Sequence, residues 1–123
     1  MNTRRHAREL VEDLCERSDL AVQVGAVLMD RNGRLVSWGW NHLVANPRGN
    51  SKSCHAEEHA FSRANPERLR GARLIVAGRR RKSGNWITAR PCESLCMGLA
   101  RKHGVKTIEY VTPGGTWSIV RLE

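Results

Sequence analysis

The chain has 123 residues and is 40% hydrophobic, which fits a single domain over residues 1–123 with one packed core. No apolar run reaches the length of a membrane span, and no apolar segment follows the basic start, so we expect a cytoplasmic protein without a membrane partner. The net charge of +9 favours an anionic partner such as nucleic acid or a nucleotide, although solubility alone would also account for it.

Periodicity and breaker residues predict the elements in chain order. They indicate a helix over 3–17, strands over 21–29 and 34–40, a helix over 54–64, a strand over 72–78, a short extended segment over 86–88, a helix over 92–103, and strands over 105–111 and 116–122. In the first helix, Cys15 falls on the apolar face and is predicted to be a core thiol. Residues 30–33 (DRNG) read as a hairpin turn between the first two strands, and Gly104 closes the third helix.

These elements predict an α/β fold, with a mixed sheet of about five strands and helices on its faces. Only residues 112–115 (TPGG) separate the last two strands. Because a crossover helix needs about a dozen residues or more, the last two strands are expected to form an antiparallel hairpin.

Three side chains that can bind a metal fall at predicted helix starts. His55 lies in the first turn of the second helix, and Cys92 and Cys96 lie in the first turns of the third. Both helices are expected to begin at the same end of the sheet, where one histidine and two cysteines suit tetrahedral Zn²⁺ with a fourth position left for water. From the same turn as His55, the Glu57 carboxylate can reach that position and act as a general acid and base.

The motifs HAE at 55–57 and PCESLC at 91–96 resemble the signature H-x-E…P-C-x-x-C of the zinc-dependent cytidine and deoxycytidylate deaminase superfamily. Residues 24–41, which end in Gly-Trp-Asn, are similar to the first hairpin of that family, and residues 96–111 are similar to its third helix and fourth strand. The resemblance covers about residues 20–120, which is nearly the whole chain.

The resemblance implies a three-layer α/β/α cytidine deaminase-like fold and a zinc ion held by His55, Cys92 and Cys96. It also implies hydrolytic deamination of cytosine to uracil, in which Glu57 moves a proton to ring atom N3 and to the leaving ammonia.

The cysteine spacing departs from the family pattern. Residues 93–95 (ESL) separate Cys92 from Cys96, which gives C-x-x-x-C. Because residues four apart still share a helix face, the extra residue is expected in a loosened first turn. Cys54 is an alternative ligand, but it adjoins His55 and is expected to point elsewhere.

The same residues allow two other functions. His55, Glu58 and His59 spell H-x-x-E-H, the zinc site of inverzincin proteases, but this reading leaves the later cysteines unexplained. The other alternative is a non-catalytic, zinc-stabilised nucleic-acid-binding module, which would need a fourth protein ligand such as Cys54 or His103.

The resemblance further implies that Asn41 contacts the substrate sugar, and that the Ala56 N–H and a carbonyl near Arg90 recognise the base edge. Trp86 follows the basic stretch 79–85, a combination that suits single-stranded nucleic acid, although packing at the end of the sheet is the alternative.

Three substrate classes stay open within the family. They are cytosine in a nucleotide such as CMP or dCMP, cytosine in single-stranded DNA or RNA, and adenine in tRNA. A free nucleotide would need a closed pocket, which a neighbouring subunit of a homo-oligomer usually completes.

Overall fold

The computed structural model describes residues 3–45 and 51–122. In chain order the elements are α1 (Thr3–Leu14), the 3₁₀ turn η1 (Cys15–Arg17), β1 (Val22–Met29), β2 (Leu35–Trp40), β3 (His42–Ala45), β4 (Ser51–Cys54), α2 (Ala56–Arg63), the 3₁₀ turn η2 (Pro66–Arg68), β5 (Arg73–Arg80), β6 (Trp86–Ile87), α3 (Cys96–Lys102), β7 (Thr107–Val111) and β8 (Trp117–Arg121). No helix among these residues is both long enough and apolar enough to cross a membrane.

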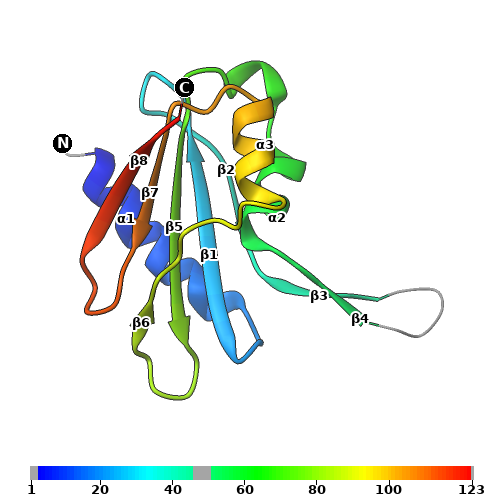
Figure 1. Ribbon diagram of the computed structural model, residues 1–123, viewed down its shortest axis with the longest axis vertical. Helices are drawn as coiled ribbons and strands as arrows, with labels where there is room; N and C mark the ends of the chain where they lie inside the picture. The colour runs from blue at the N-terminus through cyan, green and yellow to red at the C-terminus, as the bar shows by residue number, and fades with distance from the viewer. Residues whose placement is uncertain (1–2, 46–50, 123) are drawn as a thin grey trace.

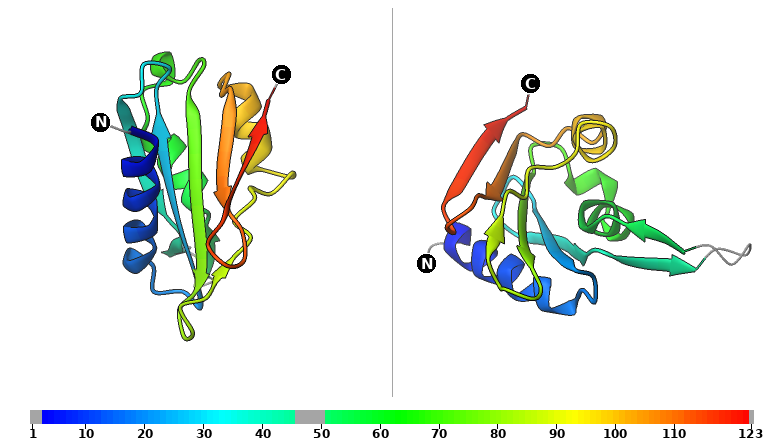
Figure 2. Two further views of the ribbon diagram at one scale, coloured as in Figure 1. Left: turned by 90° about the vertical axis from the view of Figure 1, so that its left-hand side faces the viewer. Right: turned by 60° about the horizontal axis from the view of Figure 1, so that its bottom comes forward.

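A mixed sheet forms the middle layer of the fold (Figure 1). Its strand order is β2-β1-β5-β7-β8, and the short β6 pairs with the end of β5. β5 and β7 run parallel, whereas β1 is antiparallel to both β2 and β5, and β7 and β8 form an antiparallel hairpin. α1 covers one face of the sheet across β1 and β5, and α2 and α3 lie on the other face (Figure 2). The predicted α/β architecture and the final hairpin are therefore confirmed.

Each helix layer makes a close approach to the sheet at a glycine. A Cβ atom on Gly25 of β1 would lie 2.5 Å from the carbonyl oxygen of Val11, so the α1 backbone rests directly on the strand. On the opposite face, a Cβ atom on Gly39 of β2 would lie 2.6 Å from the carbonyl oxygen of Ala56, at the start of α2. Cys15, the first residue of η1 directly after α1, is fully buried, as predicted, and burial raises the pKa of its thiol to about 11.

Side chains of the α2 region occupy the open edge of the sheet at β2. The Trp38 carbonyl accepts a hydrogen bond of 3.1 Å from Arg63, and the Trp40 N–H donates one of 3.2 Å to His59 Nδ1. Arg68 likewise donates to the Leu35 carbonyl at 3.2 Å. These contacts use three of the backbone groups that an edge strand would otherwise offer to an incoming strand, so strand addition at β2 is disfavoured.

The structure corrects the predicted third helix. α3 begins at Cys96, not at residue 92, so Cys92 lies in the turn before the helix and not in its first turn. The reason is local: Leu95 has φ −135° and ψ −64°, outside the helical region, and this breaks the helix on its N-terminal side.

The structure also contains a hairpin that the sequence analysis did not predict, formed by β3 and β4 and hereafter called the arm (residues 42–45 and 51–54). Consecutive residues on β3, Leu43 and Val44, are both exposed, so the strand lacks the apolar–polar alternation that marks a half-buried strand. Its two strands pair with each other as a separate ribbon.

Candidate metal centre and active site

The start of α2 positions His55 and Glu57. His55 precedes the helix with an extended backbone (φ −70°, ψ 149°), so it is the cap residue and not part of the first turn. Its N–H donates to Glu58 Oε1 at 3.1 Å, and its carbonyl accepts the first helical hydrogen bond, from the His59 N–H at 3.0 Å. These two bonds fix the backbone on both sides of the His55 imidazole.

The turn before α3 accommodates the additional residue between the cysteines. The Cys92 carbonyl accepts from the Met97 N–H at 2.9 Å, five residues on, and the Cys92 sulfur accepts from the Cys96 N–H at 3.4 Å. A bond that spans five residues makes a wider turn than the four-residue α-helical bond. The expected loosening is therefore present, and it lies in residues 93–95, immediately before the helix.

The two helix starts bring three metal-ligating atoms together. The donor atoms of His55, Cys92 and Cys96 all lie within 4.8 Å of one another. His55 Nδ1 is 3.4 Å from Cys96 Sγ and 3.7 Å from Cys92 Sγ. Tetrahedral Zn²⁺, with bonds of about 2.3 Å to sulfur and 2.0–2.1 Å to nitrogen, sets N and S ligands about 3.6 Å apart. The imidazole and the two thiols thus fit this ion in donor type and in separation.

The two thiols differ in acidity. Burial alone would raise the pKa of Cys92, but hydrogen bonds from the backbone at Cys96 and Leu95 outweigh it and lower the pKa. Burial raises the pKa of Cys96, and the nearby Glu57 carboxylate raises it further. A thiol crowded by negative charge becomes a thiolate most readily when a divalent cation binds it, which is the chemistry of a zinc site.

Glu57 is a buried carboxylate beside this cluster. Only 6% of its surface is exposed, and desolvation raises its pKa, although a backbone hydrogen bond and the His55 imidazole oppose the shift. A buried glutamate with a raised pKa at the edge of a cavity has the properties of a proton-transfer group.

A cavity of about 300 Å³ opens above these groups. Most of the residues singled out from the sequence line it: Asn41, His55, Ala56, Glu57, Arg90 and Cys92. Ala56 stands at the N-terminus of α2, where the first N–H groups have no partner within the helix.

The Asn41 side chain is already engaged with β1. Its amide nitrogen donates to the Val22 carbonyl at 2.7 Å, and its oxygen accepts from the Val24 N–H at 2.8 Å. One N–H and one lone pair of the amide remain for another partner. Asn41 thus fastens the beginning of β1 to the end of β2 and borders the cavity as well.

Arg90 and Trp86 lie further out. The exposed Arg90 guanidinium is 3.4 Å from Glu93, and its hydrogen bonds to Tyr110 and Glu93 raise its pKa. Trp86 is not among the residues that line the cavity, although Ile87 is. The Trp86 ring instead lies 5.8 Å below the Arg79 guanidinium and packs against the core.

Sequence reasoning missed six residues that line the cavity. They are Val22, Val24, Ser53, Ile87, Thr88 and Ala89. Three of them immediately precede Arg90 and Pro91, so proximity to the PCESLC motif was an available signal. Val22 and Val24 had no such signal, because only the register of β1 brings them to the site.

The alternative ligands do not join the cluster. Among the described residues, the metal-ligating group consists of His55, Cys92 and Cys96. His59 accepts from the Trp40 N–H and packs edge-on against the Trp40 ring, with centroids 4.7 Å apart. The inverzincin arrangement, which needs His55 and His59 on one ion, is therefore not formed.

Comparison with known proteins agrees with this geometry. Residues 1–112 match the family described as the cytidine and deoxycytidylate deaminase zinc-binding region. No curated protein matches the chain.

Several solved structures share the fold. A cytidine deaminase from Burkholderia pseudomallei has a TM-score of 0.63 at 18% identity, covering 95% of this chain and 91% of its own. One from Mycobacterium leprae has a TM-score of 0.58 at 23% identity, covering 97% and 93%. Acinetobacter baumannii RibD has a TM-score of 0.64 at 20% identity over 90% of this chain, which spans only 28% of the RibD chain.

The family match covers most of the chain, and the His/Cys/Cys cluster carries the donor set of a zinc-binding deaminase, so Zn²⁺ is the cofactor. This chain belongs to the cytidine and deoxycytidylate deaminase zinc-binding family.

Proposed function

We propose that the chain is a zinc-dependent hydrolytic deaminase that converts cytosine to uracil, in a CMP- or dCMP-type nucleotide or in single-stranded DNA or RNA. The observation that carries the proposal is Glu57, a buried carboxylate that borders the same cavity as His55 and Cys92. Four free thiols support a cytoplasmic location. In this proposal, residues 1–123 form a single deaminase domain.

In this reaction, water replaces the exocyclic amine at C4 of the ring, so cytosine and water give uracil and ammonia. Zinc held by His55, Cys92 and Cys96 would supply Lewis-acid activation of the water. Glu57 accepts the proton of the attacking water, passes it to N3, and later transfers a proton to the leaving ammonia. The raised pKa of Glu57 supports this role, because the carboxyl group must hold a proton between the two transfers.

The remaining cavity residues orient the substrate. Asn41 offers its spare N–H and lone pair to the sugar, and Ala56 offers a backbone N–H to the base edge. Arg90 stands at the exposed rim, where a carbonyl near it would meet the base edge and its guanidinium can attract a phosphate. Trp86 lies outside the cavity, so it would contact only a flanking nucleotide of a longer strand.

The first experiment is a substrate panel. The zinc-loaded protein is incubated with dCMP, CMP, deoxycytidine and cytosine-containing single-stranded DNA and RNA, with Glu57→Ala as the inactive control. Mass spectrometry detects the gain of about one dalton when an amine becomes a carbonyl. Conversion of oligonucleotides alone identifies a polynucleotide deaminase, and conversion of free nucleotides alone identifies a nucleotide deaminase. If none of the cytosine substrates is converted to uracil, the proposal gives way to one of two alternatives: a deaminase of adenine in tRNA, or a non-catalytic zinc-binding module.

Metal analysis tests the ligand assignment separately. The purified protein should carry about one zinc per chain. His55→Ala should lose it, because two thiolates alone leave the site short of a ligand, whereas Cys54→Ser should keep it. Stoichiometric zinc in the His55→Ala protein would show that other residues hold the ion.

A further inference from the structure

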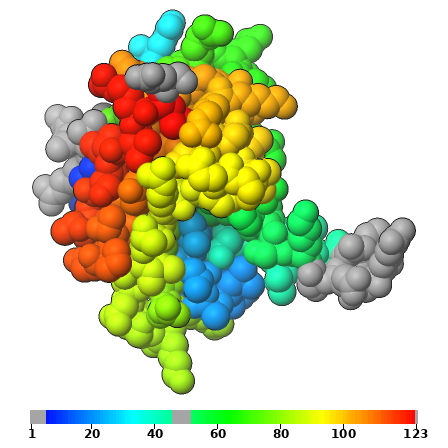
Figure 3. All heavy atoms as spheres, in the orientation of Figure 1, coloured from blue at the N-terminus to red at the C-terminus, as the bar shows by residue number. Residues whose placement is uncertain are grey.

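The arm stands away from the rest of the molecule (Figure 3). Leu43 is 57% exposed and Val44 is 46% exposed, and among the described elements the strands of the arm make their main contacts with each other. An isolated two-stranded hairpin is marginally stable in water, and it gains stability by packing its apolar side chains against another surface. Among the described residues, the Leu43 and Val44 side chains stay largely uncovered by their own chain.

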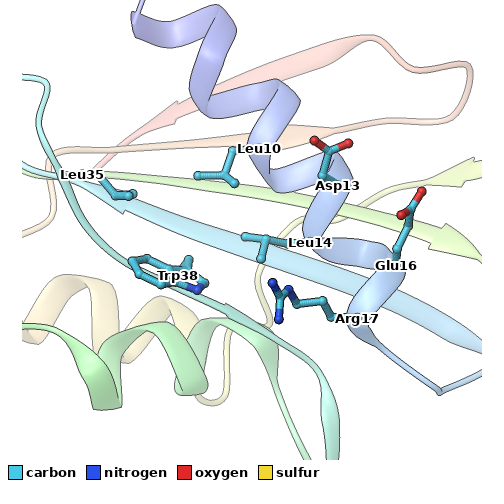
Figure 4. A pocket seen from close by; sticks show the side chains of 7 residues that line it. All are labelled: Leu10, Asp13, Leu14, Glu16, Arg17, Leu35 and Trp38. Carbon is cyan, nitrogen blue, oxygen red and sulfur yellow. The ribbon is translucent and has the colours of Figure 1, made fainter.

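An apolar cleft of about 650 Å³ lies on the opposite face of the sheet from the metal centre, between α1 and β2. Leu10 and Leu14 of α1 point across it toward Leu35 and Trp38 of β2 (Figure 4). The cleft exists because α1 packs on β1 and β5 and leaves the face of the edge strand uncovered. Three backbone groups at the edge of β2 are already occupied, which favours a partner that buries this surface by entering the cleft with side chains.

The charges of the cleft and the arm are complementary. Residues 9–16 of α1 and η1 contain four acidic residues and no basic one, in a chain whose net charge is +9. Two of them, Asp13 and Glu16, border the cleft, together with the single cation Arg17. Residues 42–54, which include the arm, contain Arg48 and Lys52 and no acidic residue. Lys52 is exposed on β4, whereas Arg48 lies outside the described residues.

We propose that the arm of one copy of this chain seats in the α1–β2 cleft of a second copy, and that the exchange is reciprocal. Val44 would enter the apolar floor, and Lys52, its cross-strand partner on the same face of the arm, would face Asp13 and Glu16 at the border. A two-fold arrangement satisfies both arms and both clefts, which closes the assembly as a dimer.

A nucleic-acid strand is the competing occupant of a basic arm. The arm suits it poorly, because residues 43–54 contain no Trp, Tyr or Phe on which a base could stack, and two successive side chains are aliphatic. Aliphatic side chains gain from burial in an apolar cleft and gain little from a phosphate backbone.

The dimer would also affect the active site, a consequence that rests on the proposed function. The arm begins directly after Asn41 and ends directly before His55, and Ser53 of β4 borders the cavity. Seating the arm would hold these residues in place, so specific activity should fall when the protein is diluted below its dimer dissociation constant.

The mass of the zinc-loaded full chain, measured by sedimentation equilibrium over a wide range of concentration, tests the dimer without reference to catalysis. Val44→Asp should weaken self-association about 100-fold or more, because it brings a charge to an apolar cleft. Ile119→Asp, a matched change at a residue 50% exposed on β8, should leave self-association unchanged.

Charge reversal tests the pairing directly. Lys52→Glu and Glu16→Lys should each weaken the dimer about 10-fold, and the double variant should regain most of the loss. Lys106→Glu, the same charge change near β7, is the control and should have no effect. A wild-type chain that stays monomeric at all concentrations overturns the proposal. So does a Lys52→Glu protein that keeps its mass but binds single-stranded oligonucleotides more weakly, because the arm would then be a nucleic-acid element.

Discussion

Glu57 and Glu58 are adjacent carboxylates with different environments. Glu57 points into the interior beside the metal cluster and is 6% exposed, whereas Glu58 is half-buried and accepts the His55 N–H at the helix cap. Desolvation raises the pKa of the first, whereas the second stabilises a helix terminus. The two side chains differ because consecutive residues of α2 point in different directions around the helix axis.

Glu57→Gln should therefore lower the turnover number by about 10²–10⁴-fold while the protein keeps its zinc, because an amide cannot carry the proton. Glu58→Gln keeps an oxygen acceptor for the His55 N–H and should retain near-wild-type turnover. Deaminase kinetics and metal content are measured on both variants. If Glu58→Gln were the inactive one, the H-x-x-E-H reading would become the better account of this helix.

At the scale of elements, the site depends on how closely α2 approaches β2. An added Cβ at Gly39 would lie 2.6 Å from both the Ala56 carbonyl and the Ala60 N–H, and such contacts force backbone movement. Gly25 makes the equivalent approach to α1 on the other face, at 2.5 Å from the Val11 carbonyl. The two glycines offer a matched pair of substitutions, one on each face of the sheet.

Gly39→Ala and Gly25→Ala should each lower the free energy of unfolding by about 1–3 kcal/mol, because both overpack a close helix–strand contact. Only Gly39→Ala displaces the helix that carries His55 and Glu57. We expect weaker zinc binding and lower turnover for that variant alone, measured by metal competition and kinetics at a temperature where both proteins are folded. Equal loss of zinc in both variants would mean that overall stability, not the position of α2, controls the site.

The β1–β2 turn makes stability depend on pH. Asp30 accepts from Arg68 at 2.8 Å and from the backbone N–H groups of Asn32 and Arg34, and these bonds hold its pKa below the usual 3.8, with Arg68 the largest cause. A lowered folded-state pKa means that the stabilisation is present above pH 3.8 and disappears as the pH falls through the folded-state value.

Asp30→Asn keeps the turn acceptor but removes the charge. Urea unfolding should show the wild type more stable than Asp30→Asn near neutral pH, and the difference should shrink as the pH falls below about 3.8. Arg68→Gln should show the same pH dependence, because it removes the other partner. If the difference in unfolding free energy between the wild type and Asp30→Asn did not change with pH, the geometry of the turn and not the charge of Asp30 would be its cause.

At the scale of the whole molecule, the net charge of +9 is distributed unevenly. The hairpin between β5 and β6 exposes Arg80 and Lys82 beyond the strand that borders the cavity, while residues 9–16 form an acidic segment on the other face of the sheet. A phosphate-bearing ligand should therefore be attracted to the cavity side of the molecule.

Affinity for single-stranded oligonucleotides should fall about 10-fold or more between about 50 and 200 mM salt, as expected for roughly three phosphate contacts. Lys82→Glu should make the salt dependence less steep. Arg31→Glu, the same change in the β1–β2 turn, should leave it unaltered. Fluorescence anisotropy measures how the oligonucleotide affinity of each variant depends on salt concentration. An affinity that does not change with salt would show that phosphate contacts do not contribute to binding.

Local sequence features were enough to predict most of the helices and strands and the candidate metal ligands. Strand alternation, a four-residue final turn and two motifs at helix starts are local features, and local features follow from spacing along the chain. They predicted the α/β fold, the terminal hairpin, and the convergence of His55 with Cys92 and Cys96.

Other features of the site follow from the three-dimensional packing of the chain. The burial of Glu57, the entry of Val22 and Val24 into the cavity, and the position of Trp86 outside it depend on strand register and on which helix covers which strand. The start of α3 at Cys96 instead follows from the local backbone conformation of Leu95. The uncovered cleft beside β2 likewise depends on contacts between segments far apart in sequence. Such contacts have no periodic signature, because the partners of a side chain are set by packing in space and not by distance along the chain.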